Sequence, residues 1–599
     1  MRRMRVWVSG CLMLGLFPTS WWSGAPPLVK RGKSVYTIVV GQSCAPSERY
    51  AAEEFSRFIK EISGAALLIK SDAESVAGPV VCIGASKRLA EVAPDLKLDG
   101  LGAEGFVIRT TRRGLVIAGG RERGTLYGVY TFLEDQLGCR WFAPDCSRIP
   151  ARRTIRLGSI NRRAVPALEY RDTDYPNSRD AAWAARNKMN GQHHATGPDR
   201  GGNVRYGPFV HTFESLISPE KYFGEHPDYF SLVKGKRLKE RSQLCLTNPE
   251  VIRLGKQRLR EWIQQHPDAT IFSVSQNDWH NFCECATCTA LAEREGSQSG
   301  PLLAFVNALA EDIEKDYPDK IVDTLAYQYT RKPPKTLRPR PNVCIRLCSI
   351  ECCFIHPLAT DPYNATFRDD IVGWSKICKR LYIWDYVINY AHTIMPFPNF
   401  YVLRPNIAFF INNGVKGIYE EACYFTKGAE MAELRTYVLA KTLWDSNYDT
   451  DRAMREFTDA YYEKAAPYLR RYIALMQHSA QATTEHIRIY SPPTSKYLSA
   501  ATLTKAESLF DRAERAVAKN PVALHRVQVA RLPILCAQIV HALKPRTAAE
   551  KMGREKVLAM IDRFEATARK EGLTRLRESG PQAPLDAWLK YVREAAQKR

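Results

Sequence analysis

Residues 35–155 alternate between short apolar runs typical of strands and longer stretches with the spacing of an amphipathic helix. The predicted strands are residues 36–40, 80–83, 106–108 and 115–118. The predicted helices are residues 47–62 and 124–137. Mixed elements over about 120 residues are typical of a small domain, so we predict a compact α/β accessory domain at residues 30–155.

A repeated pattern follows, in which a short apolar strand, a polar tip and an amphipathic helix recur through residues 160–440. The predicted strands are residues 168–173, 209–213, 243–246, 271–275, 321–327, 343–349, 381–384 and 415–419. Eight strands with helices between most of them, over about 275 residues, fit the size of a (β/α)8 TIM barrel. We therefore predict an α/β fold with a catalytic barrel in this region.

From Met431 onward the strand pattern ends, and residues 441–599 carry almost only helical spacing. We predict an α-helical carboxyl-terminal domain. At the other end, residues 1–25 combine Arg2, Arg3 and Arg5 with an apolar stretch at residues 6–17, which is typical of a signal peptide. The sequence therefore predicts export to the periplasm or the outside of the cell. Lipid anchoring at Cys11 is a less favoured alternative, because the apolar run continues past this residue.

Composition excludes some classes of protein. The net charge is +22, from 86 Lys and Arg against 64 Asp and Glu, but no element concentrates the excess, so we expect no nucleic-acid partner. No later segment approaches 18 uncharged apolar residues, so we expect no membrane span. Gly-rich phosphate loops and Gly-x-Ser-x-Gly elbows are also missing from the sequence, and we expect no cofactor.

Candidate chemistry lies just past the carboxyl ends of the predicted strands, where (β/α)8 barrels hold their sites. These positions carry acidic, aromatic and amide side chains, namely His211, Asn277, Asp278, Trp279, Tyr327, Glu351, Trp384, Asp385, Tyr386, Glu420 and Glu421. Glycoside hydrolysis needs one protonated carboxyl and one charged carboxylate, and clustered carboxyl groups raise the pKa of one another. Aromatic rings can stack against sugars. The inventory therefore predicts a glycosidase site.

Three cysteines and a histidine lie close together in the loop after the fourth predicted strand, namely His280, Cys283, Cys285 and Cys288. Three thiols and an imidazole could hold a structural Zn²⁺. The irregular spacing, and the export that residues 1–25 predict, favour a loop disulfide with one spare thiol. The sequence leaves both possibilities open.

Several longer stretches resemble a known bacterial family. Residues 123–144 (RGTLYGVYTFLEDQLGCRWFAP) resemble the end of the accessory domain that precedes the barrel in hexosaminidases and α-glucuronidases. Residues 225–230, 243–249, 273–278 and 381–386 resemble the family catalogued as domain of unknown function 4838. Its characterised members form glycoside hydrolase family 163, endo-β-N-acetylglucosaminidases that act on N-glycans. The resemblance covers roughly residues 35–460.

The resemblance implies a retaining mechanism in which the substrate's own 2-acetamido oxygen attacks the anomeric carbon. One carboxylate orients that amide, and another carboxyl acts first as acid and then as base. Related barrels place an Asp-Glu pair after the fourth strand, where this chain has Asn277 and Asp278. We therefore expect Asp278 to orient the amide and Glu351 to donate the proton, with Glu420 and Asp385 as further catalytic candidates.

The remaining candidates are expected to bind the sugar, namely His211, Asn277, Trp279, Tyr327, Trp384, Tyr386 and Glu421. The expected partner is a glycan or glycoprotein, and the sequence gives no oligomeric state. Two alternatives stay open. One is an α-glucuronidase-like hydrolase, for which Arg346 could clamp a uronate. The other is a glycan-binding barrel without activity, because the acid pair is altered at Asn277.

Overall fold

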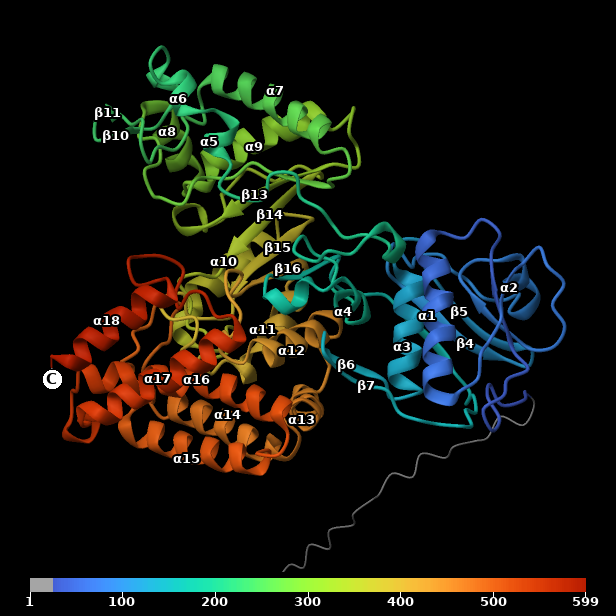
Figure 1. Cartoon of the computed structure of the whole chain (residues 1–599). Helices are drawn as coiled ribbons and strands as arrows, with labels where there is room; N and C mark the ends of the chain where they lie inside the picture. The colour runs from blue at the N-terminus through green and yellow to red at the C-terminus, as the bar shows by residue number, and fades with distance from the viewer. Residues whose placement is uncertain (1–24, 599) are drawn as a thin grey trace, which may run out of the picture. The chain divides into compact units, whose positions relative to one another are not determined.

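A computed structural model describes residues 25–598 of the chain, which form two compact units (Figure 1). The predicted export signal lies outside these residues, apart from position 25. The first unit comprises residues up to 138 together with residues 149–165. The second comprises residues 139–148 and 166 onward, so the barrel region and the carboxyl-terminal helices belong to one unit.

A six-stranded sheet forms the first unit, in the order β2-β1-β3-β5-β4-β8. Its strands are β1 (Thr37–Val40), β2 (Ile69–Ser71), β3 (Val80–Ile83), β4 (Phe106–Thr111), β5 (Gly114–Gly119) and β8 (Asn161–Ala164). Helices α1 (Pro46–Ser63) and α3 (Gly124–Asp135) pack beside each other, while α2 (Lys87–Val92) covers a second apolar cluster that contains Val39 and Val116. Because both faces are covered, the central strands β1, β3 and β5 are apolar almost throughout.

The second unit is built on a curled sheet of six parallel strands in the order β12-β13-β14-β15-β16-β9. The strands are β9 (Tyr170–Thr173), β12 (Ile271–Ser273), β13 (Ile321–Ala326), β14 (Val343–Cys348), β15 (Leu381–Tyr386) and β16 (Val415–Glu421). The helices that follow them along the chain include α9 (Ser299–Ile313), α10 (Ala365–Ser375), α11 (Phe400–Asn412) and α12 (Ala432–Trp444). Six of the eight predicted strands are therefore present.

The two other predicted strands are wrong, for different physical reasons. Residues 209–213 follow Pro208, which has no N–H to donate, and His211 has a φ of 53°, so regular pairing cannot continue. This segment still lies beside β12, because Thr212 N donates to the Ser275 carbonyl at 3.0 Å. Residues 243–246 pair outside this sheet, since Leu244 forms an antiparallel bridge with Phe230. The regular sheet is thus a curled half barrel.

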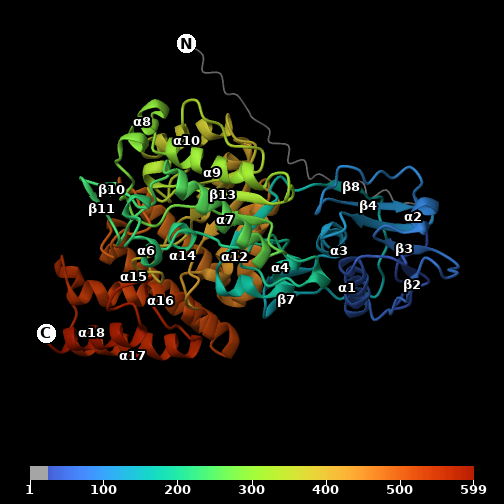
Figure 2. The ribbon, with the colours of Figure 1, turned by 90° about the horizontal axis from the view of Figure 1, so that it is seen from above.

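The carboxyl-terminal helices form a layered bundle, in which successive helices pack side by side (Figures 1 and 2). They are α13 (Thr450–Tyr461), α14 (Ala466–Gln481), α15 (Ala500–Ala516), α16 (Pro521–Leu543), α17 (Arg554–Glu571) and α18 (Leu585–Gln597). Their connecting segments approach the carboxyl ends of the barrel strands. In the described residues no helix is both long and apolar enough to cross a membrane.

Candidate active site

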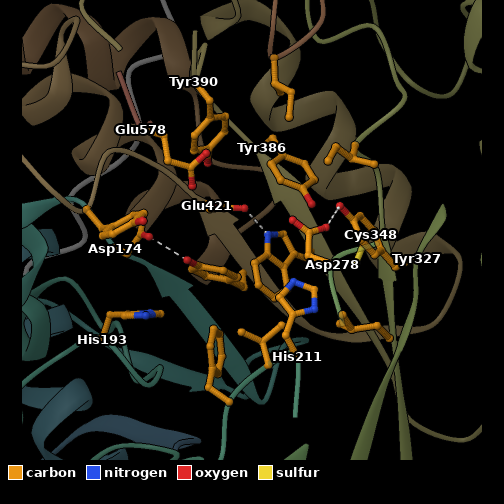
Figure 3. A pocket seen from close by; sticks show the side chains of 18 of the residues that line it. Asp174, His193, His211, Asp278, Tyr327, Cys348, Tyr386, Tyr390, Glu421 and Glu578 are labelled. Carbon is orange, nitrogen blue, oxygen red and sulfur yellow. Dashed lines mark hydrogen bonds between the residues drawn. The ribbon is translucent and has the colours of Figure 1, made fainter. Parts of the chain in front are cut away.

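A cavity of about 360 Å³ lies in the second unit, at the carboxyl ends of the parallel strands (Figure 3). Its wall includes Asp174 after β9, Asp278 after β12 and Glu421 at the end of β16. The segments between carboxyl-terminal helices complete it with Tyr490 and Glu578. Four carboxyl groups and several aromatic rings therefore share one cavity.

Strand register decides which of the predicted residues face this cavity. On β15 the cavity is lined by Trp384 and Tyr386, and on β16 by Tyr419 and Glu421. Successive side chains of a strand point to opposite faces of the sheet. The residues between them, including Asp385, therefore point away from the cavity.

Asp385 pairs in register with Glu420, and both side chains are buried behind the sheet. Asp385 accepts a hydrogen bond from Ser349 Oγ at 2.5 Å, and burial raises its pKa to about 6. Burial, together with the charge of Asp385, raises the pKa of Glu420 well above its usual range. The expectation that these two act on substrate is not supported by their placement.

Glu421, predicted only as a sugar-binding residue, has the environment of a proton donor. Its Oε2 accepts a hydrogen bond from the Trp384 indole Nε1 at 2.6 Å (Figure 3). Burial and the nearby charge of Asp174 hold the pKa of Glu421 well above its usual range, although the indole N–H opposes this shift. A carboxyl group with a raised pKa stays protonated near neutral pH and can act as an acid.

Asp278 is exposed to the cavity and accepts a hydrogen bond from the Tyr327 hydroxyl at 2.9 Å. The residues on either side of Asp278 fix its loop by hydrogen bonds to the segment at Ser242. Asn277 Nδ2 and Trp279 Nε1 both donate to the Ser242 carbonyl, each at 2.9 Å. Neither Asn277 nor Trp279 lines the cavity, and both hold the loop that carries Asp278.

His211 lines the cavity as predicted, and its Nδ1 lies 2.7 Å from the Gln276 carbonyl. Its ring lies 6.1 Å from that of Tyr327. The left-handed backbone of this non-glycine residue is uncommon and is maintained by hydrogen bonds, such as that from His211 N to Ser275 Oγ. The strained backbone at His211 therefore directs its imidazole toward the cavity.

Glu351, the predicted proton donor, lies outside the cavity. Its carboxylate pairs with Arg331 Nη1 at 3.0 Å, and the same guanidinium contacts Asp370 at 2.6 Å. These residues line a separate surface pocket. The structure therefore does not bring Glu351 together with Asp278.

Several residues of the cavity were missed by sequence reasoning. Asp174 follows β9 and accepts hydrogen bonds from the Tyr419 hydroxyl and from Ala422 N, both at 2.7 Å. Its position just past a strand could have revealed it. Glu578 comes from a distant segment, and burial together with the charge of Asp278 raises its pKa. No local pattern marks it.

Potential metal ligands lie away from the cavity. Cys245 joins three of the predicted residues, Cys283, Cys285 and Cys288, in one group of thiols. His280 is not part of this group, and its ring lies 5.9 Å from that of Tyr329. A second group, among the described residues, consists of Cys353, His356, Asp361 and His486.

The molecule is an α/β protein with a curled parallel sheet, and carboxyl groups and aromatic rings gather at the carboxyl edge of that sheet. The chain belongs to the family described as domain of unknown function (DUF4838), whose model matches residues 141–474. A second model, glycosyl hydrolase family 67 N-terminus, matches residues 29–132. No curated protein matches the chain.

Solved structures with a similar fold include a family GH115 4-O-methyl-α-glucuronidase with specificity for decorated arabinogalactans. It has a TM-score of 0.56 at 12% identity, covering 91% of this chain and 81% of that one. A family 89 glycoside hydrolase from Clostridium perfringens has a TM-score of 0.48 at 11% identity, covering 92% and 75%. A β-hexosaminidase from Streptomyces plicatus has a TM-score of 0.42 at 12% identity, covering 74% and 92%.

Proposed function

We propose that this protein is a glycoside hydrolase that cleaves glycans containing β-linked N-acetylglucosamine. The observation that carries the proposal is that two carboxyl groups in different surroundings line the same aromatic-walled cavity. Glu421 has a pKa raised well above its usual range, whereas Asp278 is exposed to the cavity. Glu421 is suited to donate a proton, and Asp278 is placed to contact the substrate from the same cavity, and glycoside hydrolysis uses two such carboxyl groups.

In the proposed mechanism, Glu421 donates its proton to the oxygen of the leaving sugar. Asp278, held by the Tyr327 hydroxyl, orients the 2-acetamido group, whose oxygen attacks the anomeric carbon. Glu421, now charged, then takes a proton from the water that opens the cyclic intermediate, which leaves the anomeric configuration unchanged. This assigns the acid role to Glu421 in place of Glu351.

The cavity favours a neutral sugar over a uronate. Among the described residues that line it, four carboxyl groups face no Lys or Arg, and of its two histidines, His193 and His211, the first already pairs with Asp172 at 2.9 Å. Arg346, which could have clamped a uronate, is 1% exposed and pairs with Asp323 at 2.8 Å. Its guanidinium lies 4.9 Å from the ring of Trp384, and Arg346 itself does not line the cavity. Recognition of a uronate carboxylate would need an available cation.

The test is release of glycan from an N-glycoprotein, followed by mass spectrometry, beside aryl β-N-acetylglucosaminide and aldouronic acid substrates. We expect cleavage next to N-acetylglucosamine and a loss of about 10²–10⁴-fold in kcat for Glu421→Gln. Asp278→Asn should lose activity on acetamido sugars to a similar extent. The export predicted from residues 1–25 leads us to propose extracytoplasmic glycans as the natural substrates.

Matched controls come from the same strand and the same rim. Glu420→Gln changes a neighbouring buried acid that faces away from the cavity, and Glu351→Gln changes the acid paired with Arg331. Both should keep activity. Turnover of aldouronic acids alone would favour the α-glucuronidase-like alternative. Glycan binding by a folded protein without turnover of any substrate would make it a binding protein.

A further inference from the structure

Four cysteines from separate parts of the second unit meet at one point beside the loop that carries Asp278. Cys245 follows the bridge at Leu244, Cys283 and Cys285 lie in the loop after β12, and Cys288 lies in the first turn of α8 (Ala286–Glu295). Their sulfur atoms all lie within 4.8 Å of one another. The spacing along the chain hides this grouping, because Cys245 is distant in sequence from the other three.

The separations between sulfur atoms suit a shared metal ion. Cys245 Sγ and Cys285 Sγ lie 3.6 Å apart. Zn²⁺ bound by four thiolates at about 2.3 Å places its sulfur atoms about 3.8 Å from one another. A disulfide would need about 2.05 Å between two sulfurs and would leave the other two unconnected. The four-fold convergence is therefore better explained by a tetrahedral ion than by a single bridge.

Hydrogen-bond donors surround these sulfurs, as thiolates require. Leu232 N donates to Cys283 Sγ at 3.4 Å, and Arg237 Nη1 lies 3.7 Å from the same sulfur. Thr247 Oγ1 lies 3.1 Å from Cys288 Sγ. Leu232 and Arg237 belong to the hairpin of β10 (Leu232–Val233) and β11 (Lys236–Arg237), which covers the cluster. A guanidinium and a backbone amide directed at sulfur stabilise negative charge on it, and the same Arg237 Nη1 also donates to the Phe230 carbonyl at 2.6 Å.

We propose that Cys245, Cys283, Cys285 and Cys288 bind a structural Zn²⁺ ion as a tetrathiolate site. All four positions are filled by protein ligands, so the ion has no open position for chemistry and acts by tying chain segments together. It would join the segment that carries Cys245, helix α8 and the loop that carries Asp278. The site is independent of the proposed glycosidase activity.

The experiment measures zinc in the full-length protein by elemental mass spectrometry, after purification without chelators. We expect one zinc ion per chain, four sulfur ligands by X-ray absorption, and the ligand-field bands of tetrahedral tetrathiolate cobalt after exchange with Co²⁺. Release of zinc by a thiol-blocking mercurial should lower the Tm by several degrees. These readouts on the unmodified chain do not depend on whether a variant folds.

Variants locate the ion. Cys245→Ser and Cys288→Ser should lose zinc, whereas Cys353→Ser should retain it, because Cys353 belongs to the other group of potential ligands. His280→Asn should also retain zinc. Absence of zinc from the unmodified protein, a disulfide between any two of the four cysteines, or zinc lost only in Cys353→Ser would overturn the proposal.

Discussion

Replacing Trp384 with Phe tests whether Glu421 is the acid of the reaction. The indole Nε1 of Trp384 donates to Glu421 Oε2 at 2.6 Å, which is a short hydrogen bond to a carboxyl group that burial already disfavours in its charged form. Phe keeps an aromatic ring in the wall but has no donor. Because the N–H stabilises the charged form, its removal raises the pKa of Glu421 further.

The size of the shift follows from the strength of that hydrogen bond. Hydrogen bonds to charged groups contribute about 1.5–3 kcal/mol, and one pKa unit corresponds to about 1.4 kcal/mol. Trp384→Phe should therefore raise the pKa of Glu421 by about 1–2 units. The alkaline limb of the pH profile of kcat, where the acid loses its proton, should move to higher pH by the same amount.

Two readouts separate this effect from a loss of sugar stacking. The pH profile gives the position of the alkaline limb, and ¹³C NMR of glutamate-labelled protein follows the carboxyl group directly, with Glu421→Gln to assign the signal. Tyr386→Phe is the matched control, because it removes a hydroxyl from the same wall while the bond from Trp384 to Glu421 remains. The control should keep the alkaline limb of the parent protein.

An unchanged alkaline limb in a folded Trp384→Phe variant would refute the assignment. So would an NMR titration of Glu421 at an ordinary carboxyl pKa in the parent protein. A loss of affinity with no movement of either limb would mean that Trp384 serves only as a sugar platform. The acid would then have to be sought among the other cavity carboxyls, Asp174 and Glu578.

Two further predictions concern other acids. Asp385 has a folded pKa of about 6 and a usual value of 3.8, so its contribution to stability is full below pH 4 and is lost as pH rises through 6. About two pKa units correspond to about 3 kcal/mol, so the parent protein should lose about that much free energy of unfolding between pH 4 and 7, whereas Asp385→Asn should not. Denaturant unfolding of both proteins across this pH range measures the difference. Parallel pH dependences of the two proteins would contradict this prediction. Glu578→Gln should raise KM about tenfold with little change in kcat, as expected when a neutral amide accepts a hydrogen bond from substrate more weakly than a carboxylate does. Glu571→Gln, a change in the His525 ion pair, is the control, and a fall in kcat as large as that of Glu421→Gln would instead make Glu578 the acid.

The sequence was sufficient to predict most of the sheet, because buried parallel strands read as continuous apolar runs between amphipathic helices. β13, β14 and β15 lie where the pattern indicates. The segment at residues 209–213 is also apolar, and its failure to form a strand depends on the neighbouring Pro208 and on the backbone of His211. A pattern of hydrophobicity cannot report a missing donor or a positive φ.

The expectation that active-site residues lie at the carboxyl ends of barrel strands identified many residues of the cavity, but it does not distinguish the two faces of a strand. It gave Asp278, Tyr327 and Glu421, which line the cavity, together with Asp385 and Glu420, which do not. Every residue near a strand end satisfies this expectation, whereas only alternate ones reach the cavity. Tyr490 and Glu578 were beyond prediction, because only tertiary packing brings the helical region to the strand ends.

Glu420 and Glu421 show why burial alone does not identify a catalytic acid. Burial raises the pKa of both neighbours well above the usual range. Glu420 faces Asp385 behind the sheet, so its proton has no route to a substrate. Glu421 lies beside Trp384 and lines the same cavity as Asp278. A one-residue shift in the register of β16 would exchange their surroundings, so the strand register, more than the acidity of either side chain, determines which carboxyl can do chemistry.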